Sequence, residues 1–120
     1  MSFAVSWETI CHKNDIVANS GRAALIDGEQ VAIFRVSLDG SEQYFALANY
    51  CPFSHANVIS RGIVGSLDGR LVVASPIYKE HFDLQTGVCL EDDSVVLQTW
   101  AVQLDGDQIQ VATVDEEVAV

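Results

Sequence analysis

The sequence predicts an all-β fold, a small antiparallel β-sandwich or barrel, on three observations. Asp-Gly pairs occur at residues 27–28, 39–40, 68–69 and 105–106, and this dipeptide is a strong signal for a two-residue hairpin turn. Short β-branched or alternating runs stand between the pairs at even spacing, as in sandwiches and small barrels. Helical periodicity is nowhere sustained, and the best helical candidate, residues 7–17, is too polar and lacks an apolar stripe.

The strands are expected in a simple order along the chain. A three-stranded meander over residues 23–47 turns at the first two Asp-Gly pairs. A hairpin follows around the third pair, and Pro76 ends its second strand because proline cannot donate to a central ladder. The remaining strands are expected at residues 81–84, 95–97, 99–104 and 108–112, with the last hairpin turning at Asp105-Gly106.

One domain is expected over residues 1–114, because a chain of 120 residues has the usual length of a single domain. Residues 115–120, Asp-Glu-Glu-Val-Ala-Val, are expected to form a disordered acidic tail.

The chain is strongly acidic. Six Lys and Arg residues stand against seventeen Asp and Glu residues, which gives a net charge of −11. Such a surface repels phosphate backbones and anionic lipid headgroups, so neither a nucleic acid nor a membrane is expected as a partner. Solubility alone is the favoured explanation of the charge, and docking onto an electropositive protein patch is the alternative.

The sequence also indicates a cytoplasmic protein. No apolar run approaches the ~20 residues of a membrane span, and the first residues do not have the pattern of a signal peptide. Three cysteines, Cys11, Cys51 and Cys89, are an odd number, which argues for reduced thiols.

Two irregular loops hold most of the reactive side chains: loop one, residues 49–61, and loop two, residues 75–79. With the segment that follows, they supply Cys51, His55, His81 and Cys89, a ligand set that zinc accepts. Only the first pair has the close spacing of a zinc knuckle, so buried cysteines that act as small hydrophobes are the favoured interpretation. A nucleophilic Cys51 has no local signature, and a glycine-rich phosphate loop is missing.

Both loops resemble those of Rieske proteins, which hold a [2Fe–2S] cluster with two Cys and two His. In that family the ligands come as Cys-Pro-His and Cys-Pro-x-His, and an aromatic residue, Asp and Thr-Gly follow. The corresponding stretches here are Cys51-Pro52-Phe53, Ser75-Pro76-Ile77-Tyr78 and residues 82–87.

The four ligand positions are therefore Cys51, Phe53, Ser75 and Tyr78, and three of them do not match. Phenylalanine has no lone pair for iron, and serine is a poor substitute for a thiolate. One thiolate cannot hold two irons, so we expect no cluster and no metal or other cofactor in this chain.

Three further strings carry a narrower resemblance. They are Ser-Arg-Gly-x-Val-Gly at residues 60–65, Ala-Ser-Pro-x-Tyr-Lys at 74–79 and Thr-Gly-x-Cys-Leu-Glu-Asp at 86–92. Together they are similar to the small subunit of bacterial assimilatory NADH-dependent nitrite reductase, a Rieske-like domain without cluster ligands. The resemblance implies a cytoplasmic partner of a large subunit that carries FAD, an iron–sulfur cluster and sirohaem. That large subunit reduces nitrite to ammonia with electrons from NADH, and no catalytic residue is expected in this chain.

The resulting hypothesis is a docking module whose two loop tips meet the large subunit. The candidate partner-binding residues are Phe53, Ser54, His55, Tyr78 and Lys79, since aromatic and amphipathic groups are typical interface anchors. Phe53 and Tyr78 could instead turn inward and fill the space that a cluster would take. Two other functions stay open: an electron carrier with unusual cluster ligands, and a stand-alone regulatory or binding β-domain.

Overall fold

The computed structural model describes residues 3–77 and 79–116, with side chains for 6–77 and 79–113. The strands are β1 (Phe3–His12), β2 (Ser20–Ile26), β3 (Glu29–Leu38), β4 (Ser41–Ala48), β5 (Tyr50–Cys51), β6 (Ala56–Asn57), β7 (Ile63–Leu67), β8 (Arg70–Ala74), β9 (His81–Asp83), β10 (Thr99–Trp100), β11 (Val102–Asp105) and β12 (Gln108–Glu116). Two short 3-10 turns, η1 (Lys13–Asp15) and η2 (Ile59–Arg61), complete the secondary structure. Neither approaches the length and apolarity that a membrane-spanning helix needs, and the described chain has no other helix.

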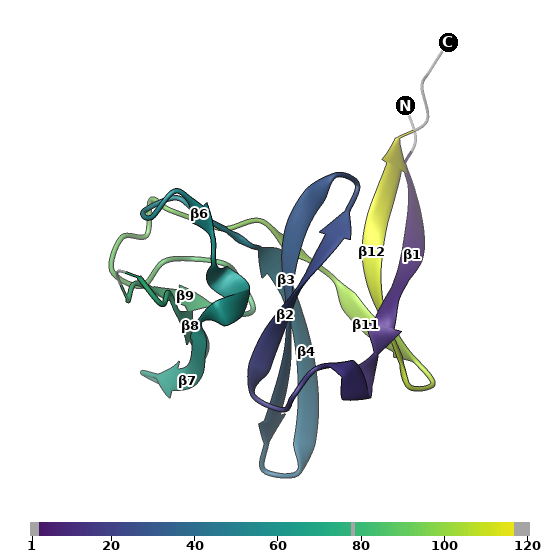
Figure 1. Ribbon diagram of the computed structural model, residues 1–120, viewed down its shortest axis with the longest axis horizontal. Helices are drawn as coiled ribbons and strands as arrows, with labels where there is room; N and C mark the ends of the chain where they lie inside the picture. The colour runs from purple at the N-terminus through teal and green to yellow at the C-terminus, as the bar shows by residue number, and fades with distance from the viewer. Residues whose placement is uncertain (1–2, 78, 117–120) are drawn as a thin grey trace.

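The all-β prediction is confirmed, and the strands form antiparallel sheets. Their orders are β1-β12-β11, β10-β4-β3-β2, β5-β6 and β7-β8-β9. The meander β2-β3-β4 lies in the middle of Figure 1, between the β7-β8-β9 sheet on one side and the β1-β12-β11 sheet on the other. It is therefore the element against which both outer sheets pack.

Turn chemistry explains three of the hairpins. Both residues of Asp27-Gly28, Asp39-Gly40 and Asp68-Gly69 have positive φ angles, with 50°, 50° and 52° at the aspartates. This is the type I′ turn, whose twist matches that of the flanking strands. The fourth hairpin turns one residue later than predicted, because Asp105 pairs with Gln108 and leaves Gly106 and Asp107 as the loop. Gly106, at φ 60°, then occupies the first central position, where a type II′ turn requires glycine.

Strand β3 separates two hydrophobic cores. Its consecutive residues 31–34 are all buried, and alternate side chains point to opposite faces of a strand. Phe34 and Val36 enter a first core with Phe82 and Leu97, whereas Ile33 enters a second core with residues of β2 and β12. The first core also includes Cys51 and Ile59 of loop one, so the central strand helps to position this loop.

The largest departures from prediction lie near the two ends of the described chain. Residues 7–17 contribute mainly to strand β1, which pairs with β12 along most of its length. The strand expected at 99–104 breaks at Ala101, so that β10 joins β4 and β11 joins β12. The strand expected at 95–97 is reduced to a single bridge between Val96 and Val88. Strand β12 continues to Glu116, into the segment expected as a tail, and residues 117–120 lie outside the described part.

A polar cluster holds η1 against the meander. Arg35 binds Glu42 through Nε at 2.9 Å and also through Nη2, and Tyr44 donates its hydroxyl to the other Glu42 oxygen at 2.7 Å. Arg35 Nη1 donates to the carbonyl oxygens of Ile16, at 3.1 Å, and Lys13, at 3.3 Å. Burial, together with the hydrogen bond to Glu42, raises the pKa of Tyr44 to about 12.

Tyr44 is expected to ionise later than an ordinary tyrosine in an alkaline titration followed by tyrosinate absorbance. The folded protein keeps the Tyr44 proton at a pH where the unfolded chain has lost it. Its contribution to stability is thus complete below pH ~10 and declines as the pH rises toward the folded pKa of about 12. The Tyr44→Phe variant should lack this late step. A wild-type titration in which all tyrosines ionise near pH ~10 would contradict the expectation.

Candidate functional site

The two loops have the same closed form. In loop one, the His55 N–H donates to the Cys51 carbonyl at 2.8 Å, and in loop two the Lys79 N–H donates to the Ser75 carbonyl at 3.0 Å. Each loop therefore closes with a bond to the residue four positions earlier, which directly precedes a proline. His55 and Lys79 both have left-handed backbones, with φ of 56° and 62°, which is uncommon for residues other than glycine. Cys51 and Ser75, which the sequence motifs align, thus begin turns of the same backbone form, and His55 and Lys79 end them.

Cys51 of loop one and Ser75 of loop two lie side by side. The Cys51 sulfur lies 3.9 Å from the Ser75 hydroxyl oxygen, and both residues are buried, at 0% and 1% exposure. The two positions predicted as former cluster ligands are therefore neighbours. Sequence spacing could place them on two loops, but only the fold shows that they meet.

Hydrogen bonds around Cys51 stabilise its thiolate against the opposing effect of burial. Burial acts to raise the pKa of the Cys51 thiol, but hydrogen bonding by the Ser54 side chain and by the backbone of Ser54 and Phe53 outweighs it, and the pKa lies below its usual value. The buried Ser54 Oγ makes no conventional hydrogen bond within the described chain.

Phe53 packs toward the interior. Its ring centroid lies 6.2 Å from that of Phe82, with the planes tilted by 45°, and the half-buried side chain contacts the first core. The ring at this predicted ligand position is thus turned toward the core. A role for Phe53 at a partner interface stays a prediction.

Of the other tip residues, two are exposed, Ser54 is half-buried and one lies outside the described part. His55 is exposed, and its Nδ1 lies 3.1 Å from the Tyr50 hydroxyl; Lys79 is exposed as well. Tyr78 lies outside the described residues. Sequence reasoning missed Tyr50 and Ile77, which are large and 47% and 49% exposed. Both residues could have been found from the sequence, because each is adjacent to an X-Pro pair.

The zinc ligand set does not assemble. His81 binds Glu91 instead, through its ring Nδ1 at 2.8 Å and its N–H at 2.7 Å, and the Cys89 thiol lies 3.7 Å from the same carboxylate. Burial would raise the pKa of Glu91, but the His81 bonds outweigh it, so this carboxyl group is more acidic than usual. Nowhere in residues 6–77 and 79–113 do three His, Cys, Asp or Glu side chains gather so as to hold a metal ion.

The residues present also do not fit a [2Fe–2S] cluster. Of the described ligand positions, only Cys51 offers a thiolate. Ser75 offers a hydroxyl, and Phe53 offers a ring that already packs against the core.

Thiol labelling of the native protein is expected to modify Cys11 slowly and to spare the other two cysteines. All three are free, but Cys51 and Cys89 are buried and Cys11 is half-buried. Burial, with the nearby charge of Asp15, raises the pKa of Cys11, so less of it is thiolate at neutral pH. Mass spectrometry should show one adduct on folded protein and three after denaturation. Rapid native labelling of the Cys11→Ser variant would contradict the burial of Cys51 and Cys89.

Comparisons with known proteins agree with this geometry. Residues 6–112 match the family described as Rieske-like [2Fe-2S] domain. The chain is 40% identical to the nitrite reductase (NADH) small subunit of Salmonella typhimurium, over 88% of this chain and 95% of that one. The NMR structure of the Escherichia coli protein NirD superposes with a TM-score of 0.83 at 36% identity, covering 92% of this chain and 98% of that one.

A much longer relative is the nitrite reductase [NAD(P)H] large subunit of Klebsiella oxytoca. It is 32% identical over 88% of this chain, but the match takes up only 11% of its own length. Since the similarity to the Salmonella protein spans nearly the full length of both chains, the chain belongs to the family of nitrite reductase (NADH) small subunits, with a Rieske-like fold.

Proposed function

We propose that this chain is a cluster-free accessory subunit of a cytoplasmic NADH-dependent nitrite reductase, which docks on the large subunit through its two loop tips. The large subunit is expected to carry FAD, an iron–sulfur cluster and sirohaem, and to reduce nitrite to ammonia. The small chain contributes a surface and no reacting group.

The observation that carries this proposal is the contrast between the loops and their ligand positions. The loops keep matching closures, and Cys51 and Ser75 still meet in a buried pair at 3.9 Å. The ligands themselves are lost, with Phe53 packed on the core. A fold that keeps its loop geometry without its redox group is one retained for the surface that the loops present.

The Klebsiella relative supports the choice of partner. A stretch similar to this chain takes up 11% of a polypeptide that is named as a large subunit. A domain of this kind can therefore be part of the large subunit itself. This favours a small chain that works beside the large one over a stand-alone regulator.

The first test is the metal content of the chain purified anaerobically on its own. We expect no bound iron and no visible absorption. A broad absorption between roughly 400 and 600 nm with two irons per chain would overturn the cluster-free part of the proposal and favour the electron-carrier alternative.

The second test is binding to the large subunit. The variant His55→Asn/Lys79→Asn removes both exposed tip groups, and asparagine tolerates the left-handed backbone of these positions. We expect binding to weaken about tenfold or more, as at an interface anchor. The matched control is Asp39→Asn/Asp68→Asn, two hairpin positions with similar φ angles. Equal binding by both variants would exclude docking through the tips.

A further inference from the structure

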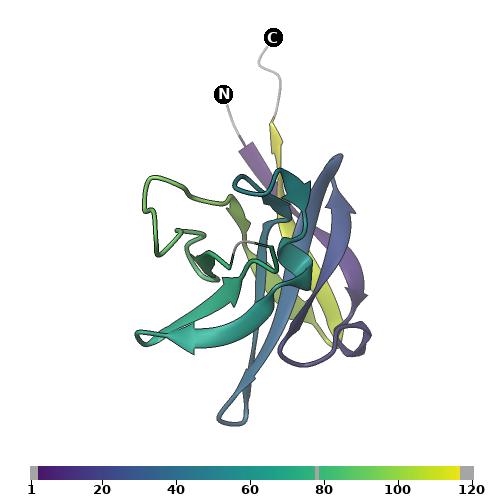
Figure 2. The same cartoon turned by 60° about the vertical axis from the view of Figure 1, so that its left-hand side comes forward.

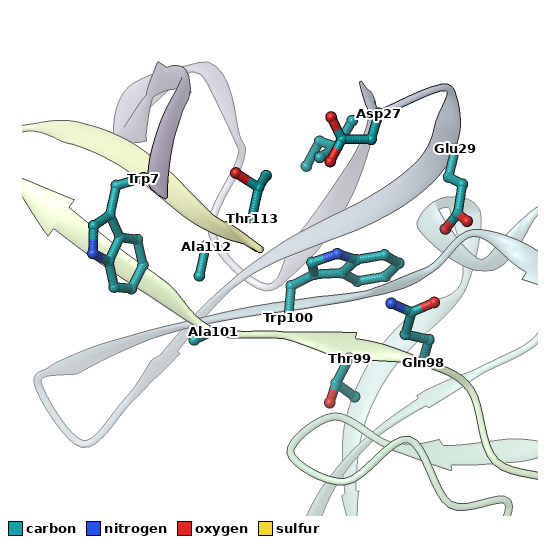
Figure 3. A pocket seen from close by; sticks show the side chains of 10 residues that line it. Trp7, Asp27, Glu29, Gln98, Thr99, Trp100, Ala101, Ala112 and Thr113 are labelled. Carbon is teal, nitrogen blue, oxygen red and sulfur yellow. The ribbon is translucent and has the colours of Figure 1, made fainter. Parts of the chain in front are cut away.

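A groove lies between the β1-β12-β11 sheet and the turn of the β2-β3 hairpin. Its volume is about 510 Å³, and its walls include Trp7, Trp100, Asp27, Glu29, Gln98 and Thr99. Figure 3 shows the Trp100 ring near the middle of this lining, with Gln98 and Glu29 to one side, Asp27 above and Trp7 on the other side beside Ala112. The groove is separate from the described ligand positions, since Cys51, Phe53 and Ser75 do not line it.

Both tryptophans of the chain line this groove. Trp7 is 40% exposed on β1, and Trp100 is half-buried, with part of its ring packed on the second core. Large aromatic side chains that stay accessible to solvent are enriched at protein interfaces. Their ring faces also attract cations, and tryptophan does so most strongly.

The charged groups at the groove have one sign. Asp27 and Glu29 are exposed, and neither forms a salt bridge with a described residue. All six Lys and Arg residues of the chain are described, and none lines the groove. Unpaired carboxylates beside indole rings disfavour an anion, and a purely apolar ligand would have to desolvate them without compensation. The ligand that suits both the carboxylates and the indole rings is a cation that also carries apolar surface.

We propose that this groove receives an arginine or lysine side chain from a basic segment of the large reductase subunit. The identity of the partner rests on the proposed function. The net charge of −11 favours a basic protein surface. Loop one and the β2-β3 turn both lie toward the end of the molecule at which β12 finishes (Figures 1 and 2), so one partner can span loop one and the groove.

The test compares two charge-matched variants in titrations against the large subunit at low and high salt. Asp27→Asn/Glu29→Gln removes the groove carboxylates, and Asp39→Asn/Asp68→Asn removes two carboxylates from other hairpin turns. Asp27 shares the type I′ conformation of the two control aspartates, so the backbone effect of its substitution is matched. We expect the groove variant to bind about tenfold more weakly with a shallower salt dependence, and the control to bind within about twofold of wild type. Equal losses in both variants would mean a general charge effect and overturn the proposal.

A second measurement needs no large subunit. The indole N–H signals of Trp7 and Trp100 are followed by NMR during titration with acetyl-arginine amide, and separately with the uncharged citrulline analogue. We expect both signals to shift with arginine only, and Trp7→Phe to bind more weakly than wild type. Absence of shifts would refute cation binding in the groove, even if a complex with the large subunit forms. Shifts with arginine, together with unchanged complex formation by the groove variant, would overturn the protein partner and leave a small cation as the ligand. Failure of wild type to bind the large subunit, with arginine shifts intact, would instead refute the proposed function.

Discussion

Replacing Gly87 with alanine is expected to lower the free energy of unfolding by about 2–5 kcal/mol, from a strained backbone and a steric clash together. Gly87 has φ of +81°, and an added Cβ would lie 2.1 Å from the carbonyl oxygen of Leu97. The neighbouring backbone cannot easily retreat, because the Leu97 N–H donates to the Gly87 carbonyl at 2.8 Å and the Gly87 N–H donates to Asp83 at 2.7 Å. The Thr-Gly string after loop two therefore has a structural reason. Chemical denaturation measures the loss.

The matched control is Gly69→Ala. Gly69 has a similar φ of +76°, but nothing lies within 4 Å of an added Cβ. This variant should therefore lose only the conformational part, about 1–2 kcal/mol. The difference between the two variants isolates the clash with Leu97. Equal losses would show that the segment around Leu97 shifts without cost.

Local chemistry allowed much of the fold to be predicted from the sequence. The meander β2-β3-β4 follows from two Asp-Gly turns and the alternation between them, and it is observed as predicted. Strand β1 could not be found in the same way. Its described side chains are mostly exposed, and its partner β12 lies at the other end of the chain, so its pairing is non-local. The break at Ala101 is a tertiary effect too, since adjacent strands β10 and β11 join different sheets.

The candidate site, too, could be predicted from the sequence only in part. The motifs indicated that Cys51 and Ser75 hold equivalent places, and the loop closures agree. The 3.9 Å contact between them and the packing of Phe53 on Phe82 depend on the whole fold. The groove was missed for a related reason. Trp7, Asp27 and Trp100 come from β1, a hairpin turn and β10, and no sequence period links them.

Truncation of Phe82 is expected to have the largest effect of any single side chain near the loops. Phe82 is fully buried in the first core, pairs with Val73 in the sheet and bridges to Cys89. Phe82→Ala should cost about 3–5 kcal/mol, as for other buried phenylalanines, whereas Phe82→Leu, which keeps most of the volume, should cost less than about 1.5 kcal/mol.

The interaction energy between Phe82 and Phe53 shows whether Phe53 belongs to the core or to the docking surface. If its ring is part of the core, as the 6.2 Å centroid separation indicates, a double-mutant cycle with Phe53→Ala should give about 0.5–1.5 kcal/mol of interaction energy. Phe53→Ala should then weaken docking only through loss of loop stability, which the free energy of unfolding reports. Additive losses with a strong binding defect would instead assign Phe53 to the interface. The core would then hold the loops without it, and the docking surface would extend from the exposed tip residues onto this ring.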